Sequence, residues 1–422
     1  MNRLWDESDV VERLCRALDI TRRSVALFAE RGYTDSEVVE NSFRPDKPIA
    51  EATMLLYAAS GVNQPAVADR VDDLARTLAP LARSTRIMLS MALHPSACVE
   101  FAVPHVLLSK IGLVDEEFDH FLDLCLSSQA SGGHERPPFA SLERRWILML
   151  WKEDESGRDW QVELEQSVLN RPIDILGGIK EDAYALTHLV MYCSDFGFDV
   201  KELPRPLTEV IGDARSLLAR CLDEEDYDLA AEVLMIWPQL GAPWCASSTF
   251  AFRVLTAVED EVGVLPSVRT KTERLNELEG EDRTKYAYAT AYHTALVMGL
   301  LCAVALRRGT LPPAELPDAM VDRGLIGELS SFIDQDQGHW QPVFDALPRS
   351  ERSMLAPFLL DTALAQKFRT RNYDAANRLL GIAKRYGMGQ SPLSVQASEM
   401  LDRLVAFSMR ADVGAKSPSA SG

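Results

Sequence analysis

The sequence predicts an all-α protein, in which helical hairpins follow one another as a continuous solenoid or close into an α/α ring. Apolar residues recur with helical spacing in nearly every ordered stretch, and strand-like alternation bounded by hairpin turns is missing. The stretch 287–306 carries no formal charge over twenty residues. A helix that is apolar all round must be buried on all sides. Its tyrosines, threonines and His293 match lipid poorly, so we expect the central helix of a soluble body with helix well above the globular average of about a third.

The N-terminal helical part is expected to span 1–128. Glycine, proline and polar breaks divide its helical pattern into six helices, predicted at 9–31, 46–60, 65–81, 84–93, 100–110 and 115–126. The segment 127–138 is rich in serine, glycine and proline, which is typical of a long loop. It is the best candidate for a boundary between two parts of the chain.

The C-terminal helical part, 139–410, is expected to pack continuously on the first. Its predicted helices are 141–151, 181–196, 208–222, 226–239, 246–262, 270–280, 283–307, 314–333, 350–366, 372–387 and 393–409. The stretch 226–234 parallels 372–380, since each has an acidic or amide cap, a tyrosine, small residues and an aliphatic pair. This parallel indicates either two units of a helical-hairpin repeat or two similarly capped helices. The polar tail, 411–422, is expected to be disordered.

The charge and cysteine content exclude several classes of function. The net charge is −19 and the pI is near 4.9, which argues against binding nucleic acid or adhering to an anionic membrane surface. Seven scattered cysteines without a CxxC pair predict reduced, buried thiols and a cytoplasmic location. The charged N-terminus lacks the apolar segment of a secretory signal.

Two nearly uncharged helices carry the candidate catalytic residues. Helical spacing puts Tyr184, His188 and Asp195 near one face of the first, and His293 lies on the second. Histidine titrates near neutrality and can act as an acid or a base, while a hydroxyl or carboxylate can orient it. The candidate set is therefore His188 and His293 as acid/base groups, with Tyr184, Asp195 and Tyr292 in support. If both helices border one pocket of ordinary size, we expect the two imidazoles within about 12 Å of each other.

The alternative is that both histidines are core residues, satisfied by neighbouring hydroxyls or carbonyls. No HExxH motif is present, and we identified no paired ligands one turn apart, so the sequence assigns neither metal nor cofactor. His94 and Cys98 have helix-compatible ligand spacing, with His105 further along. However, a proline adjoins each of the two histidines, so we expect these three residues on different turns.

Several stretches resemble a known group of proteins. They are 185–197 (ALTHLVMYCSDFG), 45–48 (PDKP) and Tyr292-His293-Thr294. The chain resembles, over most of its length, an uncharacterised group of all-helical actinobacterial proteins of unknown function, found near specialised-metabolite gene clusters. The resemblance implies a biosynthetic or accessory role and brings no established catalytic residue.

Three functions remain open. The first is an enzyme or small-molecule-handling protein of bacterial specialised metabolism, with histidine acid/base chemistry in a central pocket. The second is a helical-repeat interaction module that binds a peptide or carrier protein in its concave face. The third is a structural partner within a complex. A polar-lined cavity would favour the first, and an open groove with exposed aromatic residues the second.

Overall fold

A computed structural model describes residues 5–35, 37–133, 135–152, 160–178, 180–200, 202–317, 323–334 and 338–415, with the side chains of 323 and 411–415 left out. Across these ranges the chain is 73% helix and contains no strand. Tyr33 and Phe43 form one isolated antiparallel bridge. The predicted all-α class is therefore confirmed.

The described part of the chain contains twenty α-helices. Their bounds are Glu7–Phe28 (α1), Asp46–Ser60 (α2), Pro65–Ala82 (α3), Thr85–Leu93 (α4), Cys98–Lys110 (α5), Glu116–Leu126 (α6), Pro138–Lys152 (α7), Gln161–Gln166 (α8), Lys180–Cys193 (α9), Leu207–Asp223 (α10), Tyr227–Leu240 (α11), Ala246–Val262 (α12), Thr272–Glu277 (α13), Gly280–Arg308 (α14), Arg323–Ser330 (α15), Trp340–Asp345 (α16), Arg349–Met354 (α17), Ala356–Arg369 (α18), Tyr373–Arg385 (α19) and Pro392–Ala415 (α20). Short 3₁₀ turns occur at Val39–Asn41, Pro95–Ala97, Val168–Asn170 and Asp195–Gly197.

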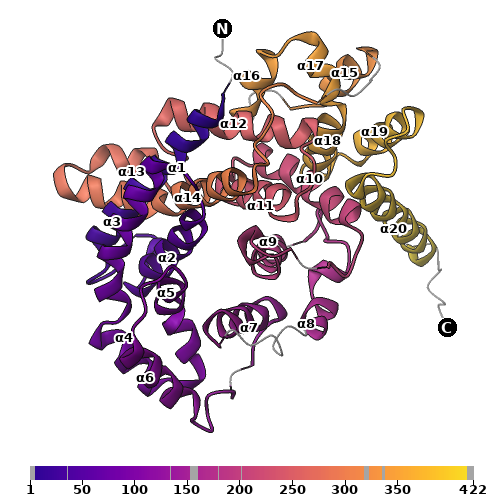
Figure 1. Cartoon of the computed structure of the whole chain (residues 1–422). Coiled ribbons are helices and arrows are strands. Elements are labelled where there is room, and N and C mark those ends of the chain that lie inside the picture. The colour runs from indigo at the N-terminus through magenta and orange to yellow at the C-terminus, as the bar shows by residue number, and fades with distance from the viewer. Residues whose placement is uncertain are drawn as a thin grey trace, which may run out of the picture.

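Helix α14 is the central element, as the uncharged stretch 287–306 predicts. It packs against α1, α2 and α11, and it crosses the middle of the molecule (Figure 1). Among the described helices, it alone is long and apolar enough to cross a membrane by itself, yet 89% of its most apolar window is buried inside the protein. Such burial is typical of the core helix of a soluble protein. Gly309 ends the helix in the left-handed conformation, directly after two arginines that complement the helix dipole.

Six helices pack pairwise in an order that returns to its start. Helix α2 contacts α5, α5 contacts α7, and α7 contacts α9. Helix α9 then contacts α11, α11 contacts α14, and α14 contacts α2 (Figure 1). The contact between α5 and α7 connects the parts of the chain before and after residues 127–138, the loop that the sequence predicts as the best candidate boundary. We refer to α2, α5, α7, α9, α11 and α14 as the helical cycle.

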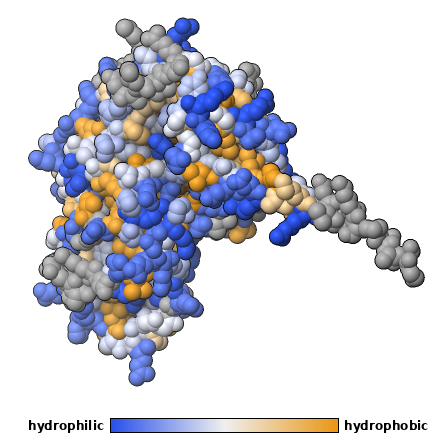
Figure 2. Space-filling model, turned by 90° about the vertical axis from the view of Figure 1, so that its right-hand side faces the viewer, coloured by the Kyte–Doolittle hydropathy of each residue, from blue (hydrophilic) through white to orange (hydrophobic). Residues whose placement is uncertain are grey.

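The later helices form a second packed group, in which α18 contacts α10, α15, α19 and α20. The two stretches that parallel each other in sequence also share one turn geometry. Glu225 and Arg371 both adopt positive φ, and Asp226 and Asn372 then cap α11 and α19 with their side chains. Helix α20 extends outward from the body (Figure 2). Phe407 on this helix is 70% exposed.

The structure differs from the sequence prediction at several element ends. The predicted helix 314–333 is wrong in extent, because 311–317 is not helical and only α15 lies beyond the undescribed residues 318–322. The predicted helix 350–366 is divided at Leu355 into α17 and α18. Helix α20 continues through Ala415, into the predicted tail, and residues 416–422 lie outside the described part.

Gly299 lets α14 approach α1 and α2 closely. A Cβ atom at this position would lie 2.6 Å from Cβ of Ala17 and 3.0 Å from Cδ1 of Leu55. We therefore expect Gly299→Ala to lower the free energy of unfolding by about 1–3 kcal/mol, as overpacked cores do. Urea denaturation would measure this change.

Gly381→Ala is the matched control, since Gly381 lies within α19 and a Cβ atom there would meet nothing within 4 Å. This variant should stabilise the protein by about 0.5–1 kcal/mol through helix propensity alone. Equal stability changes in the two variants would contradict the close packing of α14.

Candidate functional site

Two carboxylates of α11 and one imidazole of α14 converge where these two helices of the cycle pack together. Asp228 and Glu232 are one turn apart on α11, so both side chains lie on the same face. Nε2 of His293 lies 3.6 Å from Oδ2 of Asp228 and 4.0 Å from Oε1 of Glu232. The Glu232 side chain is only 3% exposed.

Glu51 of α2 approaches the other ring nitrogen of His293. Its Oε1 lies 3.4 Å from Nδ1 of the imidazole. The hydroxyl of Tyr292 donates a 2.7 Å hydrogen bond to Oε2 of Glu51, and Lys47 lies 3.6 Å from Oε1. The two nitrogens of His293 therefore face carboxylates on opposite sides.

His188 of α9 approaches Glu232 from another direction. Its Nε2 lies 3.8 Å from Oε2 of Glu232, and the same oxygen accepts a 2.6 Å hydrogen bond from the hydroxyl of Thr187. Tyr184 extends the contacts of α9 to Asp228, with its hydroxyl 3.4 Å from Oδ2. We refer to Glu51, His188, Asp228, Glu232 and His293 as the histidine–carboxylate cluster.

Burial and neighbouring charges shift the pKa values of the cluster residues, some upward and some downward. Burial lowers the pKa of His293, but the carboxylates of Asp228 and Glu51 outweigh burial and raise this pKa to about 9. Burial would raise the pKa of Glu51, but His293 lowers it to about 2. Burial and the nearby Asp228 raise the pKa of Glu232 to about 8. Burial also raises the pKa of Asp228 and lowers the pKa of His188.

The hydrogen bond from Thr187 opposes the rise in the pKa of Glu232. The hydroxyl of Thr187 lies 2.6 Å from Oε2 of Glu232, to which it donates, and 3.0 Å from the backbone oxygen of Tyr184. A donor beside a carboxylate stabilises the ionised form and lowers its pKa, but burial and Asp228 outweigh this effect.

The structure brings together four of the five residues that the sequence singled out. His188 and His293 contact the same carboxylate group, which places the imidazoles well within the expected span of about 12 Å. Tyr184 contacts Asp228, and Tyr292 donates to Glu51.

Asp195 does not join the cluster through any contact among the described residues, and its predicted place on the face of His188 is wrong. Helix α9 ends at Cys193, and both Asp195 and Phe196 adopt positive φ, which turns the chain away from the helix face. The Asp195 carboxylate instead accepts hydrogen bonds from the hydroxyl of Tyr57 and from Nε1 of Trp146.

Sequence reasoning missed the carboxylates of the cluster. The available signal was Glu232, the single charged residue in the apolar run 229–240, at a spacing of four from Asp228. Glu51 carried no local signal, because nothing in α2 indicates that its neighbour in space is His293. The statement that ligands one turn apart are missing is therefore wrong for Asp228 and Glu232.

Asp228, Glu232 and His293 form a group that could hold a metal ion, since one ligand atom of each lies within 4.8 Å of the others. The alternative group at His94, Cys98 and His105 does not assemble in the described part of the chain. His105 is fully buried and hydrogen-bonded instead, with Nδ1 accepting from Arg83 and Nε2 beside Asp119 at 2.8 Å.

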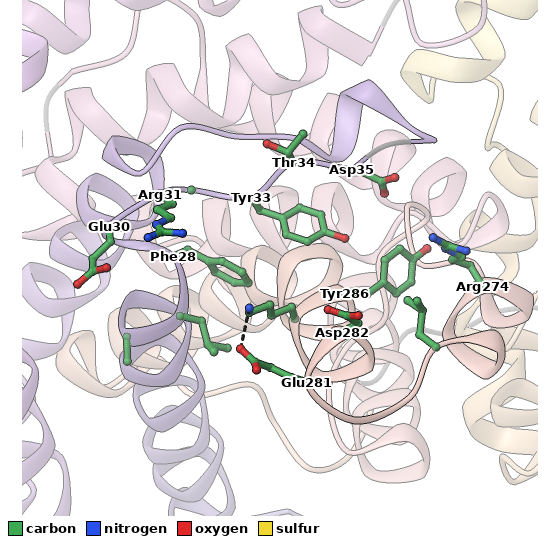
Figure 3. Close-up of a pocket in the computed structure, with 15 residues that line it drawn as sticks. Phe28, Glu30, Arg31, Tyr33, Thr34, Asp35, Arg274, Glu281, Asp282 and Tyr286 are labelled. Atoms are coloured by element: carbon green, nitrogen blue, oxygen red, sulfur yellow. Dashed lines mark ion pairs between the residues drawn. The ribbon is translucent and has the colours of Figure 1, made fainter.

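A separate pocket of about 610 Å³ opens between the end of α1, the following segment and the start of α14 (Figure 3). Tyr33 and Tyr286 line it together with charged side chains, and Lys285 and Glu281 form an ion pair across part of it. No residue of the histidine–carboxylate cluster lines this pocket. The ring of Phe43 lies between the two regions, 5.9 Å from the ring of Tyr33 and 5.4 Å from that of Tyr292.

Comparison with known proteins gives one family and no described relative. The family described as "Domain of unknown function (DUF6895)" matches residues 14–303, a range that contains the whole histidine–carboxylate cluster. No curated protein and no solved structure matches the chain. The match confirms the expected likeness to an uncharacterised family, while actinobacterial origin and association with gene clusters stay predictions.

The pKa of Glu232 has a consequence for stability that can be measured. A glutamate in the unfolded chain loses its proton near pH 4.5, whereas Glu232 in the folded chain keeps it up to about pH 8. The folded state therefore binds more protons in this window, and the free energy of unfolding contributed by Glu232 falls as the pH rises from 4.5 to 8. Glu232→Gln removes this titration.

In buffer with a chelator, we expect the variant to gain stability relative to the original chain between pH 5 and pH 8. Denaturation at several pH values would measure the difference. Parallel pH profiles for the two proteins would contradict the raised pKa.

Proposed function

The chain belongs to the DUF6895 family, whose function is unassigned, and we propose that it is an enzyme acting on a small molecule at the histidine–carboxylate cluster. We propose further that the helical cycle is a closed α/α ring and that the cluster lies inside it. Five ionisable groups from four helices, α2, α9, α11 and α14, support this proposal by converging on one place.

The energetics of burial favour a functional explanation over a structural one. Removing a charged group from water costs several kcal/mol, and well-packed apolar residues usually stabilise a core as well as a buried ion pair does. A stable helical body does not need Asp228, Glu232 and Glu51 beside one imidazole. Clusters of ionisable groups with perturbed pKa values occur most often at functional sites.

The exposure of the histidines supports access by a ligand. His188 and His293 are each 32% exposed, although both belong to helices of the cycle. Exposure of this size means that solvent reaches part of each imidazole. Glu232, between them, is 3% exposed. The accessible edges of the two imidazoles are therefore the groups that a substrate would meet.

The arrangement suits proton transfer. Two imidazoles on either side of one carboxylate can donate a proton to one atom of a substrate and accept a proton from another. The hydroxyls of Tyr184 and Tyr292 hold Asp228 and Glu51, so they would orient the carboxylates that surround His293. These contacts support a positioning role for both tyrosines.

Location and metabolic setting belong to the same proposal. All seven cysteines are free, six of them are buried, and Cys245 is partly exposed. Unpaired thiols support a reducing, cytoplasmic location. A role in specialised metabolism rests on the resemblance alone.

A second candidate function is the helical-repeat interaction module. The shared turn geometry before α11 and α19, and the packing of α10 on α18, support a repeated helical hairpin. Stacked hairpins often bind peptides in a concave face. The buried cluster has no role in that function, so we rank it second.

Replacement of each histidine tests the proposed function. A panel of small polar metabolites would be screened by ligand-detected NMR against the original chain, His188→Gln and His293→Gln, and the mixtures would be followed for product. We expect each variant to bind the ligands at least about tenfold more weakly, because one hydrogen bond to a charged group is lost. Turnover should disappear. Alanine at either position should lower the free energy of unfolding by only about 1–2 kcal/mol.

His339→Gln is the control, since His339 forms an exposed pair with Glu225 outside the cluster. It should bind and convert ligands as the original chain does. Ligands that bind all four proteins equally, or alanine variants that unfold, would contradict the proposal and favour core histidines.

A further inference from the structure

We infer that the cluster binds one divalent first-row transition-metal ion, of the class of Mn²⁺, Fe²⁺ or Zn²⁺, through Nε2 of His293 and one carboxylate oxygen each of Asp228 and Glu232. The inference deepens the proposed function and rests on it for its purpose, because the ion would lie where the substrate is expected.

The separations between the three groups fit ligands around an ion better than hydrogen bonds. Nε2 of His293 lies 3.6 Å from Asp228 and 4.0 Å from Glu232, and hydrogen bonds of this kind are about 2.7–3.2 Å long. Two metal–ligand bonds of about 2.1 Å at a tetrahedral angle separate their ligand atoms by about 3.4 Å. All three ligand atoms already lie within 4.8 Å of one another. Small side-chain rotations would therefore complete the coordination.

The two sides of the His293 ring support the same assignment. A histidine that binds a metal through one nitrogen generally donates the N–H of the other to a carboxylate, which fixes the ring and its tautomer. Glu51 lies on the Nδ1 side at 3.4 Å, where a small rotation would form this bond although the geometry does not yet meet it, while both carboxylates of α11 lie on the Nε2 side. Glu51 is itself held by Tyr292. It is therefore a positioning residue rather than a ligand.

An unsatisfied oxygen supplies an independent observation. Oδ1 of Asp228 is buried and has no hydrogen-bond partner among the described residues. Leaving a buried acceptor unpaired is unfavourable, so such atoms generally have an explanation. A bound ion, or a water on that ion, would satisfy this oxygen. The hydroxyls of Tyr184 and Thr187 lie beside the other carboxylate oxygens and would orient them.

The ligand types select the class of ion. One imidazole and two carboxylates suit Mn²⁺, Fe²⁺ or Zn²⁺, whereas Mg²⁺ and Ca²⁺ prefer oxygen ligands alone and Cu⁺ prefers sulfur. Three protein ligands leave positions for water and substrate. His188 lies on the Oε2 side of Glu232, 3.8 Å away, where it could hold a proton for a bound water or substrate. A doubly charged ion would displace the protons that Glu232 and His293 hold in its absence, because metal ligands bind in their deprotonated forms.

Metal titration of the full chain tests this inference. After dialysis against a chelator, the protein would be titrated with Co²⁺, whose visible absorption reports coordination, and with Zn²⁺ and Mn²⁺ by calorimetry. We expect one ion per chain. His293→Gln and the double variant Asp228→Asn/Glu232→Gln should weaken binding at least about 100-fold, since each removes ligands.

Glu51→Gln distinguishes a metal site from a group of buried polar side chains. It keeps the size of Glu51 but removes the carboxylate beside Nδ1, so we expect binding of Co²⁺ to weaken about 10-fold to 100-fold with the stoichiometry unchanged. The double variant Glu225→Gln/His339→Gln is the control, because it alters an exposed histidine–carboxylate pair at 2.7 Å. It should bind as the original chain does. Circular dichroism would verify that each variant is folded.

Two results would overturn the inference. One is the lack of stoichiometric binding of all three ions to the original chain. The other is binding that the control variant weakens as much as the variants of the cluster do. Metal titration without a substrate also separates this inference from the proposed function. Stoichiometric metal binding by a chain that binds no ligand of the panel would sustain the metal site and contradict the enzyme. Ligand turnover by a chain that binds none of the three ions would sustain the enzyme and contradict the metal site.

Discussion

The burial of α14 on all sides is the constraint on which the structure depends. A helix with so few charges must be covered, and α1, α2 and α11 cover it. Gly299 sets how closely the first two can approach, because even one methyl group would collide with Ala17. The same packing brings His293 against carboxylates from α2 and α11. The core and the candidate site are therefore parts of one arrangement, and a change in the tilt of α14 would alter both.

In the cluster, burial disfavours the charged forms of the side chains, whereas attraction between opposite charges favours them. Burial disfavours every charge in it, yet His293 and Glu51 stabilise each other's charged forms, and Glu232 remains protonated beside Asp228. Hydroxyls of Thr187 and Tyr292 donate hydrogen bonds to Glu232 and Glu51. Such hydrogen bonds fix the orientation of both carboxyl groups.

Much of the fold followed from the sequence, because helical period and glycine or proline breaks are local signals. The central helix, the all-α class and the shared turns before α11 and α19 belong to this group. Of the candidate site, the sequence identified the two histidines and both tyrosines, since each lies in a nearly uncharged helix. It could not identify Glu51 as their partner, because acidic residues number 63 in the chain and only tertiary packing selects one.

Two errors of the sequence prediction, at Asp195 and at the start of the helix predicted at 314–333, have the same physical cause. Asp195 was assigned to the face of His188 by extending helical spacing past Cys193, where two residues with positive φ redirect the chain. The helix predicted at 314–333 began within 311–317, where the three prolines of LPPAELP favour the irregular connection that follows Gly309. In both places the predicted helix was extended across a break in the backbone.

The order in which the cycle closes has a consequence for how the chain folds. Glu51, His188 and Glu232 are synthesised before His293, and Glu51 and Glu232 come from α2 and α11, which pack directly on α14. Until α14 packs in place, the apolar sides of α1, α2 and α11 lack the helix that covers them. Closure therefore depends on contacts between distant parts of the chain, and such contacts slow folding and prolong the exposure of apolar surface.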